Sequence, residues 1–269
     1  TGPSGPLRAL ADEHDLPTRP VPEGVPGRFA ALSAVGLVPA AILDGDIEGV
    51  LAGARAARES LAPSLFECPA YAYGATAYAL EERGATVNAF MPYAESLEPF
   101  AEWFAQLWAE SLGKAGRGQT PARALGVTDQ HSQLQLYRAG RADKQITIVD
   151  ADDRDGPTVP VAEHEELDYL GDTRLADLLA AEREATVASL AEAGQPTVRV
   201  GVDRLDAHAL GELLYSMEAA TILVGELADI ETFTQPAVEW GKRAARALLA
   251  GEETAETETI EDLPDLRVE

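Results

Sequence analysis

Cysteine is almost absent from this sequence, and so are long apolar runs. Cys68 is the only cysteine among 269 residues. A single cysteine excludes an internal disulfide and a thiolate metal cluster, and it is typical of a reducing compartment such as the cytoplasm. A membrane-spanning helix needs roughly 18–20 uninterrupted apolar residues. The apolar stretch at 29–43 is interrupted by Ser33, Gly36 and Pro39, so it predicts a buried helix instead.

Lysine is the next scarce residue, while acidic residues abound. The chain has 46 Asp and Glu against 21 Lys and Arg, for a net charge of −25, and only Lys114, Lys144 and Lys242 are lysines. Nucleic acids and anionic membranes require basic patches, and none is visible, so neither is an expected partner. This composition predicts a salt-loving host, because at 1 M salt the Debye length is about 3 Å and an acidic surface no longer repels itself. The alternative is an ordinary acidic protein with a solvated face.

Hydrophobic periodicity predicts strands that alternate with helices. Strands are expected at 85–93, 145–150 and 197–202, a short strand or turn at 122–128, and a proline-broken strand at 16–23. Helices are expected at 6–14, 29–42, 46–60, 69–84, 97–112, 129–138, 174–193, 207–227 and 237–249. This alternation predicts an α/β protein whose parallel sheet has helices on both faces.

Two residues at the ends of predicted helices suit proton transfer. Glu110 stops the run WFAQLWAE, where the helix macrodipole and neighbouring Trp108 disfavour a negative charge and so make the carboxylate a better base. His131 stands at a polar helix start, where an imidazole can shuttle protons. Such a pair can move a proton at a carbon beside a carbonyl. The plainer alternatives are an exposed last-turn glutamate and a histidine that only bonds locally near a capping box.

Two cations stand at element boundaries. Arg28 follows a Pro-Gly turn and precedes an apolar helix, and its guanidinium fork suits a phosphate or an enediolate oxygen. The alternative is a surface arginine. The stretch FTQPAVEWGKR places Gln235, Glu239 and Lys242 at the start of a helix. In a chain that avoids lysine, Lys242 is a candidate functional residue, and the alternative is a solvated cation.

Signatures of metal and nucleotide sites are missing. The four histidines never show ligand spacing such as HxxxH, which predicts no metal, and His14, His164 and His208 are expected at the surface. The sequence contains no GxGxxG, GxxxxGK[ST] or GxSxG motif, which argues against nucleotide binding and serine hydrolysis.

Four segments together resemble phosphoglucose isomerase (glucose-6-phosphate isomerase), from about Pro6 to about Leu249. PGRFAALSAVGLVPA is similar to the family's GGR-[FY]-S signature, with departures at Pro26 and Ala30. FTQPAVEWGK is similar to F-[DN]-QPGVE-x-x-K, with departures at Thr234 and Ala237 that remove no reacting group. WAESLGK and TDQHS resemble the segments that carry the family's base and its histidine.

The resemblance implies a role for each matching residue and no cofactor or metal. Glu110 would move the proton between C1 and C2, and Arg28 would stabilise the cis-enediol(ate). His131 and Lys242 would assist ring opening, and Gln106 and Gln235 would contact the sugar phosphate. In the family the histidine crosses a dimer interface, so the resemblance implies a homodimer in which His131 serves the neighbouring site.

The resemblance also implies a domain organisation. The family has two sugar-isomerase (SIS) domains, each a doubly wound parallel sheet. Residues 1–25 would be the last helix and strand of the first domain, and 26–236 the second domain with an acidic insertion at 151–168. Residues 237–250 would form a C-terminal helix and 251–269 a disordered acidic tail. Because the phosphate-gripping loop of the first domain is not found, we expect a fragment with little isomerase activity on its own.

Three other functions remain open from the sequence. The same residues could serve an isomerase that accepts both glucose 6-phosphate and mannose 6-phosphate. A SIS domain could act as a non-catalytic sugar-phosphate sensor, although a sensor has no use for a base such as Glu110. A split or degraded gene product that never acts alone is the third possibility.

Overall fold

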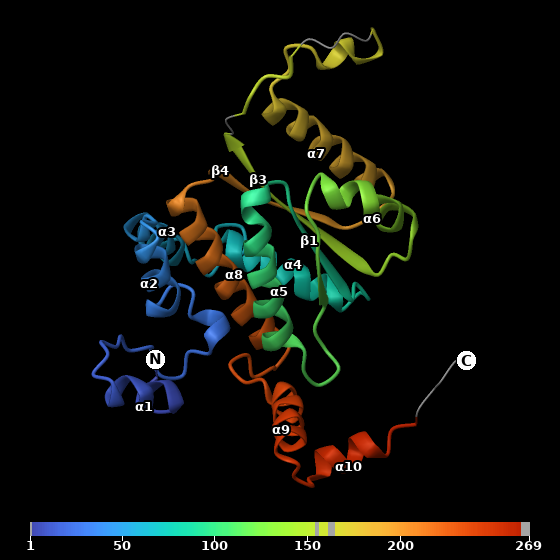
Figure 1. The fold of residues 1–269 in the computed structure, drawn as a ribbon. Coiled ribbons are helices and arrows are strands. Elements are labelled where there is room, and N and C mark those ends of the chain that lie inside the picture. The colour runs from blue at the N-terminus through green and yellow to red at the C-terminus, as the bar shows by residue number, and fades with distance from the viewer. Residues whose placement is uncertain (1, 154–155, 161–164, 265–269) are drawn as a thin grey trace. The chain divides into compact units, whose positions relative to one another are not determined.

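The computed structural model describes residues 2–153, 156–160 and 165–264, and the chain forms two compact units. The first unit is Thr1–Thr232 and contains the sheet (Figure 1). The second unit is Phe233–Glu269 and contains the last two helices. The boundary between the units follows Thr232, and residues 1–25 belong to the first unit. The predicted domain boundaries at residues 25 and 236 stay predictions.

Four parallel strands form one sheet in the order β2-β1-β3-β4. The strands are β1 (Val87–Pro92), β2 (Thr120–Arg123), β3 (Lys144–Asp153) and β4 (Thr197–Arg204). Val87 of β1 pairs with Thr120 on one side and with Lys144 on the other, and Ile146 of β3 pairs with Thr197. The chain leaves β1 for β2 and then crosses back over β1 to reach β3. Right-handed connections in opposite directions require helices on both faces of the sheet.

The helices lie close to their predicted positions, and α8 has the predicted bounds. The α-helices are α1 (Pro6–Glu13), α2 (Ala34–Ile42), α3 (Ile47–Glu59), α4 (Pro69–Glu81), α5 (Glu98–Leu112), α6 (Thr128–Ala139), α7 (Leu175–Glu192), α8 (Ala207–Leu227), α9 (Pro236–Ala250) and α10 (Ala255–Glu261). Short 3-10 helices are η1 (Gly27–Phe29), η2 (Glu95–Leu97) and η3 (Glu165–Leu170).

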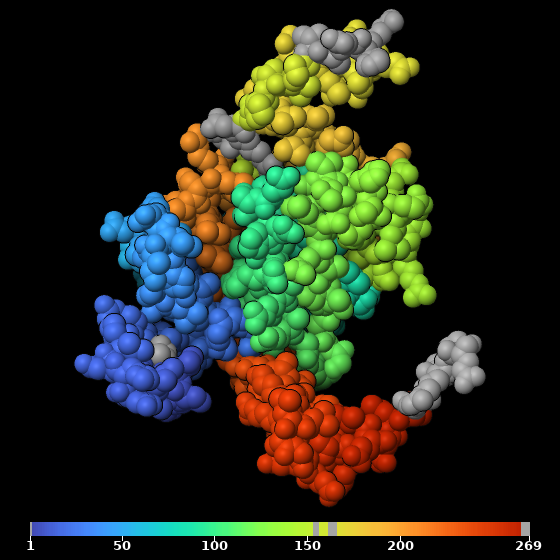
Figure 2. Space-filling view, in the orientation of Figure 1, coloured from blue at the N-terminus to red at the C-terminus, as the bar shows by residue number. Residues whose placement is uncertain are grey.

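Alternate residues of β1 fill two separate cores, one on each face of the sheet. Phe90 stacks on Phe104 of α5 with ring centroids 4.0 Å apart, in the core that α4 and α8 complete. Met91 points to the other face and packs in a cluster with Tyr137 of α6 and Leu190 of α7. In the space-filling view the surface of α5 faces the viewer (Figure 2). The predicted fold class, a doubly wound parallel sheet in three layers, is confirmed.

Helix α3 packs along α8 at two glycines. A Cβ atom built on Gly53 would lie 1.8 Å from the carbonyl oxygen of His208, and one on Gly211 would lie 1.9 Å from that of Val50. Only a hydrogen fits at either position, so the two backbones approach as closely as helices can. Because α8 leads into the segment that ends at Thr232, this contact helps to position that segment.

The predicted strand at 16–23 does not form, because no strand is assigned there among the described residues. Pro17, Pro20 and Pro22 each lack a backbone N–H, so every second or third residue is unable to donate to a neighbouring strand. The predicted terminal helix is present as α1, and only Ala11 of that helix is buried.

The acidic C-terminal region differs from its prediction as a disordered tail, since Ala255–Glu261 forms α10. Thr254 and Thr257 make a reciprocal capping box, in which each backbone N–H donates to the other side chain at 2.8 and 3.3 Å. Arg243 of α9 pairs with Glu256 at 2.7 Å. A local cap and one ion pair between helices therefore order a sequence whose composition alone predicts disorder. Residues 265–269 lie outside the described residues.

The predicted acidic insertion at 151–168 begins within a strand, because β3 continues to Asp153. His164 lies outside the described residues, whereas His14 and His208 are exposed as expected. No helix in the described part of the chain combines the length and the apolar character needed to cross a membrane.

Candidate active site

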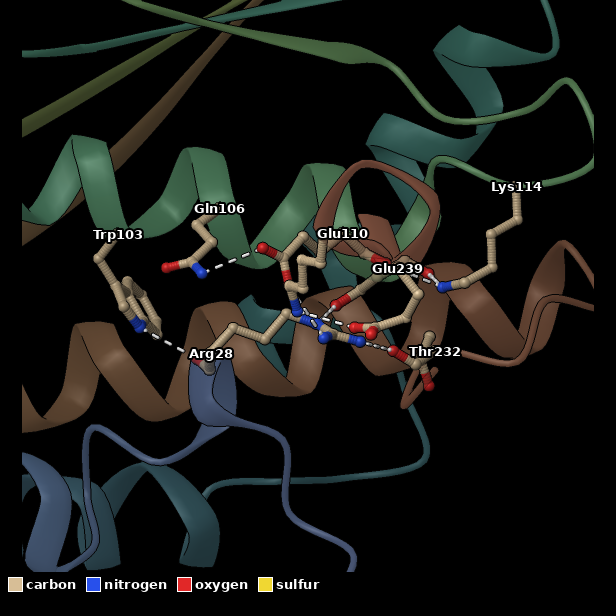
Figure 3. Close-up of polar contacts among 9 residues, drawn as sticks. Arg28, Trp103, Gln106, Glu110, Lys114, Thr232 and Glu239 are labelled. Carbon is tan, nitrogen blue, oxygen red and sulfur yellow. Dashed lines mark hydrogen bonds and ion pairs between the residues drawn. The ribbon is translucent and has the colours of Figure 1, made fainter. Parts of the chain in front are cut away.

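Arg28 is the centre of a buried polar cluster in the first unit (Figure 3). Its side chain belongs to η1 and is almost fully enclosed, at 3% exposure for the residue. Nε donates to the hydroxyl of Ser111 at 2.8 Å, and Nη2 donates to the backbone carbonyl of Thr232 at 2.6 Å. Nη1 pairs with Oε2 of Glu110 at 3.2 Å. The alternative of a surface arginine is therefore contradicted.

The backbone of Arg28 is held as firmly as its side chain. The indole Nε1 of Trp103, on α5, donates to the Arg28 carbonyl at 3.1 Å. Phe29, the next residue, is buried in the core beneath α5. Contacts at three nitrogens and at the main chain leave the guanidinium one orientation. A charge fixed in this way needs no reorganisation when a negative charge develops nearby.

Glu110 lies in the last turn of α5, and its carboxylate is partly open. One oxygen pairs with Arg28, and the other accepts a hydrogen bond from Gln106 Nε2 at 3.1 Å, one turn earlier on the helix. The relative solvent exposure of the Glu110 side chain is 28%. The structure thus brings three predicted site residues, Arg28, Gln106 and Glu110, into one cluster.

Burial and the charge of Glu110 have opposite effects on the pKa of Arg28. Burial lowers the pKa of the Arg28 guanidinium, while the charge and hydrogen bond of Glu110 raise it. An arginine side chain remains protonated in proteins, so the cluster keeps a permanent positive charge. The carboxylate of Glu110 therefore works beside a cation that does not titrate.

His131 is not part of this cluster within one chain. It lies on the first turn of α6, is exposed, and donates its backbone N–H to the carbonyl of Val127 at 3.1 Å. Helices α5 and α6 cover opposite faces of the sheet. The end of α5 that carries Glu110 leads into the start of β2, and α6 begins after the end of β2. Glu110 and His131 therefore also belong to opposite ends of the strands.

Gln235 and Lys242 belong to the second unit and are described with it. Gln235 is the residue before α9, and Lys242 lies on that helix. Lys242 Nζ pairs with Oε1 of Glu239 at 2.7 Å, and about half of its side chain is exposed. Helix α9 begins at Pro236, as the fixed φ angle of proline favours.

Four members of the cluster were not predicted. Thr232 contributes only a backbone carbonyl, which any residue type could supply. Ser111 and Trp103 are of residue types that often serve structural roles on a helix, so the sequence did not single them out. Lys114 donates to the carbonyls of Glu110 and Ser111. Its scarcity as a residue type was the one available signal, since it is one of three lysines in the chain.

The structure defines a parallel α/β domain in which a carboxylate is paired with a buried arginine, and comparison with known proteins shows what the chain is similar to. No family model matches the chain. It is 69% identical over 268 residues to the probable glucose-6-phosphate isomerase of Haloarcula marismortui, covering all of this chain and 62% of that protein. It is 70% identical over 269 residues to the probable glucose-6-phosphate isomerase of Natronomonas pharaonis, covering all of this chain and 63% of that protein.

A solved structure shares the fold of this chain. The crystal structure of a hypothetical protein from Thermus thermophilus superposes with a TM-score of 0.89 at 38% identity, over 93% of this chain and 62% of that one. The resemblance to glucose-6-phosphate isomerase is therefore confirmed along the whole chain. The chain spans somewhat over three fifths of the length of these relatives. Their hosts are halophilic, in agreement with the acidic composition.

Proposed function

We propose that this chain carries the proton-transfer site of an aldose–ketose isomerase that interconverts glucose 6-phosphate and fructose 6-phosphate. The observation that carries the proposal is the pairing of the partly open carboxylate of Glu110 with the buried, immobile Arg28. A base that can reach a substrate beside a fixed positive charge suits removal of a proton next to a carbonyl. The names of the relatives, which this chain matches over 62–63% of their length, support the same activity.

The reaction needs only proton movements. Glu110 removes the proton from C2 of the opened aldose, and the electron pair of the C–H bond forms a double bond between C1 and C2. The carbonyl oxygen on C1 takes the negative charge of the cis-enediolate, which Arg28 stabilises. A proton passes from the oxygen on C2 to the oxygen on C1. Glu110 then returns its proton to C1, and the ketone forms at C2.

The other predicted residues complete this proposal. Gln106 holds the second carboxylate oxygen of Glu110 and so orients the base towards the substrate. Gln235 contacts the sugar phosphate, and Lys242 and His131 assist ring opening by proton transfer to and from the ring oxygen and the C1 hydroxyl. We assign the enzyme to the cytoplasm, since Cys68, its only cysteine, is a buried free thiol.

A homodimer in which His131 serves the neighbouring site belongs to the same proposal. Within one chain, His131 and Glu110 lie on opposite faces of the sheet and at opposite ends of its strands. A second copy of the chain is therefore needed to bring the imidazole to the base. Helix α2 also has no buried residue although all nine of its residues are apolar, and Val35, Val38 and Ile42 are exposed. Exposed apolar surface of this kind is typical of a covered interface.

Deuterium at C2 of glucose 6-phosphate tests the reaction. In the protein expressed from its complete gene, we expect deuterium to leave C2 during turnover, either to C1 by return from Glu110 or to water by exchange from the protonated base. The Glu110→Gln variant should lose roughly 10²–10⁴-fold in kcat, the usual contribution of a general base. Glu102→Gln is the matched control, because Glu102 lies on the same helix, is largely exposed and pairs with Arg123. Sugar-phosphate binding without exchange at C2 would contradict the proposal and favour a sensor, and turnover of mannose 6-phosphate would indicate dual specificity.

Mixed dimers test the origin of the histidine. Glu110→Gln and His131→Ala homodimers should both be nearly inactive. After dissociation and reassociation of a mixture, the hybrid contains one site with an intact Glu110 from one subunit and an intact His131 from the other. We therefore expect activity to return to about half that of the wild type per hybrid. If no activity returns although hybrids form, His131 does not serve the neighbouring site.

A further inference from the structure

Lys114 folds back over the C-terminal end of α5. Its Nζ donates to the backbone carbonyl of Glu110 at 2.9 Å and to that of Ser111 at 2.6 Å, while its backbone N–H donates to the carbonyl of Leu112 at 2.8 Å (Figure 3). Carbonyls in the last turn of a helix have no partner within the helix. One nitrogen atom therefore satisfies two groups that would otherwise be left to water, and its charge opposes the negative end of the helix macrodipole.

The two residues that Lys114 holds are also two of the residues that hold Arg28. Glu110 pairs with Nη1 of the arginine, and the Ser111 hydroxyl accepts from its Nε. The main chain of this turn therefore connects the ammonium group on one side with the guanidinium group on the other. A shift of this turn would move Glu110, the proposed base, together with Ser111, which accepts a hydrogen bond from the arginine.

The ammonium is also the second cation at the base. Within the first unit, the charged groups that act on Lys114 are Arg28 of η1, Glu110 of α5 and Glu231 of the segment after α8. Burial lowers the pKa of the Lys114 ammonium, as does the charge of Arg28, while Glu231 and Glu110 raise it. The Glu110 carboxylate therefore interacts electrostatically with both cations, Arg28 and Lys114.

We propose that Lys114 is a positioning residue of the isomerase site, which fixes the last turn of α5 and so holds Glu110 and Ser111 in place against Arg28. This inference rests on the proposed function. Lysine is required rather than arginine because a single nitrogen reaches both carbonyls, whereas a planar guanidinium would divide its donors over a wider fork. The choice of lysine here, in a chain with only three lysines, has this physical reason.

The test compares Lys114→Met, Lys114→Arg and the control Arg174→Met in the protein expressed from its complete gene. Arg174 is an exposed cation that precedes α7 on the opposite face of the sheet, so its removal changes the net charge equally. Two quantities are measured for each variant. One is kcat, determined separately from KM, and the other is the ¹H–¹⁵N NMR resonance of Arg28 Nε, which donates to Ser111 and can be observed without activity.

We expect Lys114→Met to lower kcat about tenfold or more and to leave KM near that of the wild type, because the base is no longer held in place. The Arg28 Nε resonance should also move, because its acceptor Ser111 shifts with the turn. Lys114→Arg should lower kcat as well, since its donors are divided over a wider fork. Arg174→Met should change neither quantity.

Two results would overturn the inference. If Lys114→Met lowers kcat and the melting temperature but leaves the Arg28 Nε resonance where it was, the lysine only caps the helix. If Arg174→Met lowers kcat as far as Lys114→Met does, net charge rather than position is responsible. A wild-type protein without isomerase activity whose Arg28 resonance still moves in Lys114→Met would instead refute the proposed function and support the coupling between Lys114 and Arg28.

Discussion

Arg28 and Glu110 meet at 3.2 Å although 82 positions separate them in the sequence. The arginine stands on a single turn of 3-10 helix before the first large helices, and the glutamate ends the helix that follows β1. Trp103 links the same two elements through the arginine's backbone carbonyl. The pairing is therefore a property of how η1 docks on α5, and it sets the electrostatics of the proposed base.

Replacing Arg28 by lysine should damage both the reaction and the fold. A lysine can approach Glu110 but cannot also donate to the Ser111 hydroxyl and the Thr232 carbonyl, which the guanidinium reaches with separate nitrogens. Leaving buried partners unsatisfied costs about 1–3 kcal/mol each. We expect kcat/KM to fall by roughly 10²–10³-fold and the midpoint of urea unfolding to fall as well.

Arg83→Lys is the control for this prediction, because Arg83 is exposed just after α4. Enzyme assays and urea titrations on both variants separate the effects. If Arg28→Lys unfolds at the same urea concentration as the wild type, the three contacts do not contribute to stability.

The glycines between α3 and α8 should not tolerate a methyl group. In a helix interior alanine is normally favoured over glycine by about 1 kcal/mol. At Gly53 and Gly211, however, the new Cβ would meet a backbone carbonyl oxygen at less than 2 Å. We expect Gly53→Ala and Gly211→Ala each to lower the free energy of unfolding by more than about 2 kcal/mol, since overpacking that moves whole backbones falls at the upper end of its usual range.

Gly241→Ala in α9 is the matched helical control, because nothing lies within 4 Å of a Cβ there. It should leave the stability of its own unit unchanged or slightly raised. Thermal unfolding followed by circular dichroism distinguishes the three variants, and equal melting temperatures for all of them would show that α3 and α8 can separate without cost.

The sequence predicted the elements better than the contacts between them. Helix α8 could be bounded because Asp206 is a good N-cap and the apolar pattern continues unbroken to Leu227. The failed strand at 16–23 shows the limit of such patterns, since three prolines within eight residues prevent strand pairing rather than merely interrupt it. Helix α10 shows the opposite error, because acidic composition concealed a capping box at Thr254 and Thr257.

The candidate site was predicted in its residue types but not in its geometry. Arg28, Gln106 and Glu110 could be named from local motifs, and the fold brings them together. The burial of Arg28 depends on the carbonyl of Thr232, 204 positions away, and no residue-type pattern encodes a backbone acceptor at that separation. The roles of the six predicted site residues remain proposals that the variants above test.

Glu218 on α8 should make the stability depend on pH. Burial raises the pKa of this carboxyl from 4.5 to about 8, and one of its oxygens is buried without a hydrogen-bond partner. Because the folded state holds the proton more tightly than the unfolded state, this contribution to stability is complete below pH 4.5 and is lost as the pH rises to about 8. Glu218→Gln, which stays neutral, should therefore stabilise the protein on the order of 1–3 kcal/mol at pH 9 relative to pH 5.

Urea unfolding of Glu218→Gln at pH 5, 7 and 9 measures this difference. Glu226→Gln, an exposed position on the same helix, provides the control and should show no trend. A gain in stability for Glu218→Gln that is the same at all three pH values would mean that the carboxyl is not neutral in the folded protein at pH 5–7.

Salt should stabilise this chain strongly. A net charge of −25 on 269 residues opposes the compact state by self-repulsion, and the Debye length falls from about 10 Å at 0.1 M to about 3 Å at 1 M. We expect the melting temperature to climb steeply between low and molar KCl. Sucrose at matched osmolality is the control, because it favours burial without screening charge. If the melting temperature is flat in KCl, or if sucrose raises it equally, self-repulsion is not what limits stability, and the acidic surface is then an ordinary solvated one.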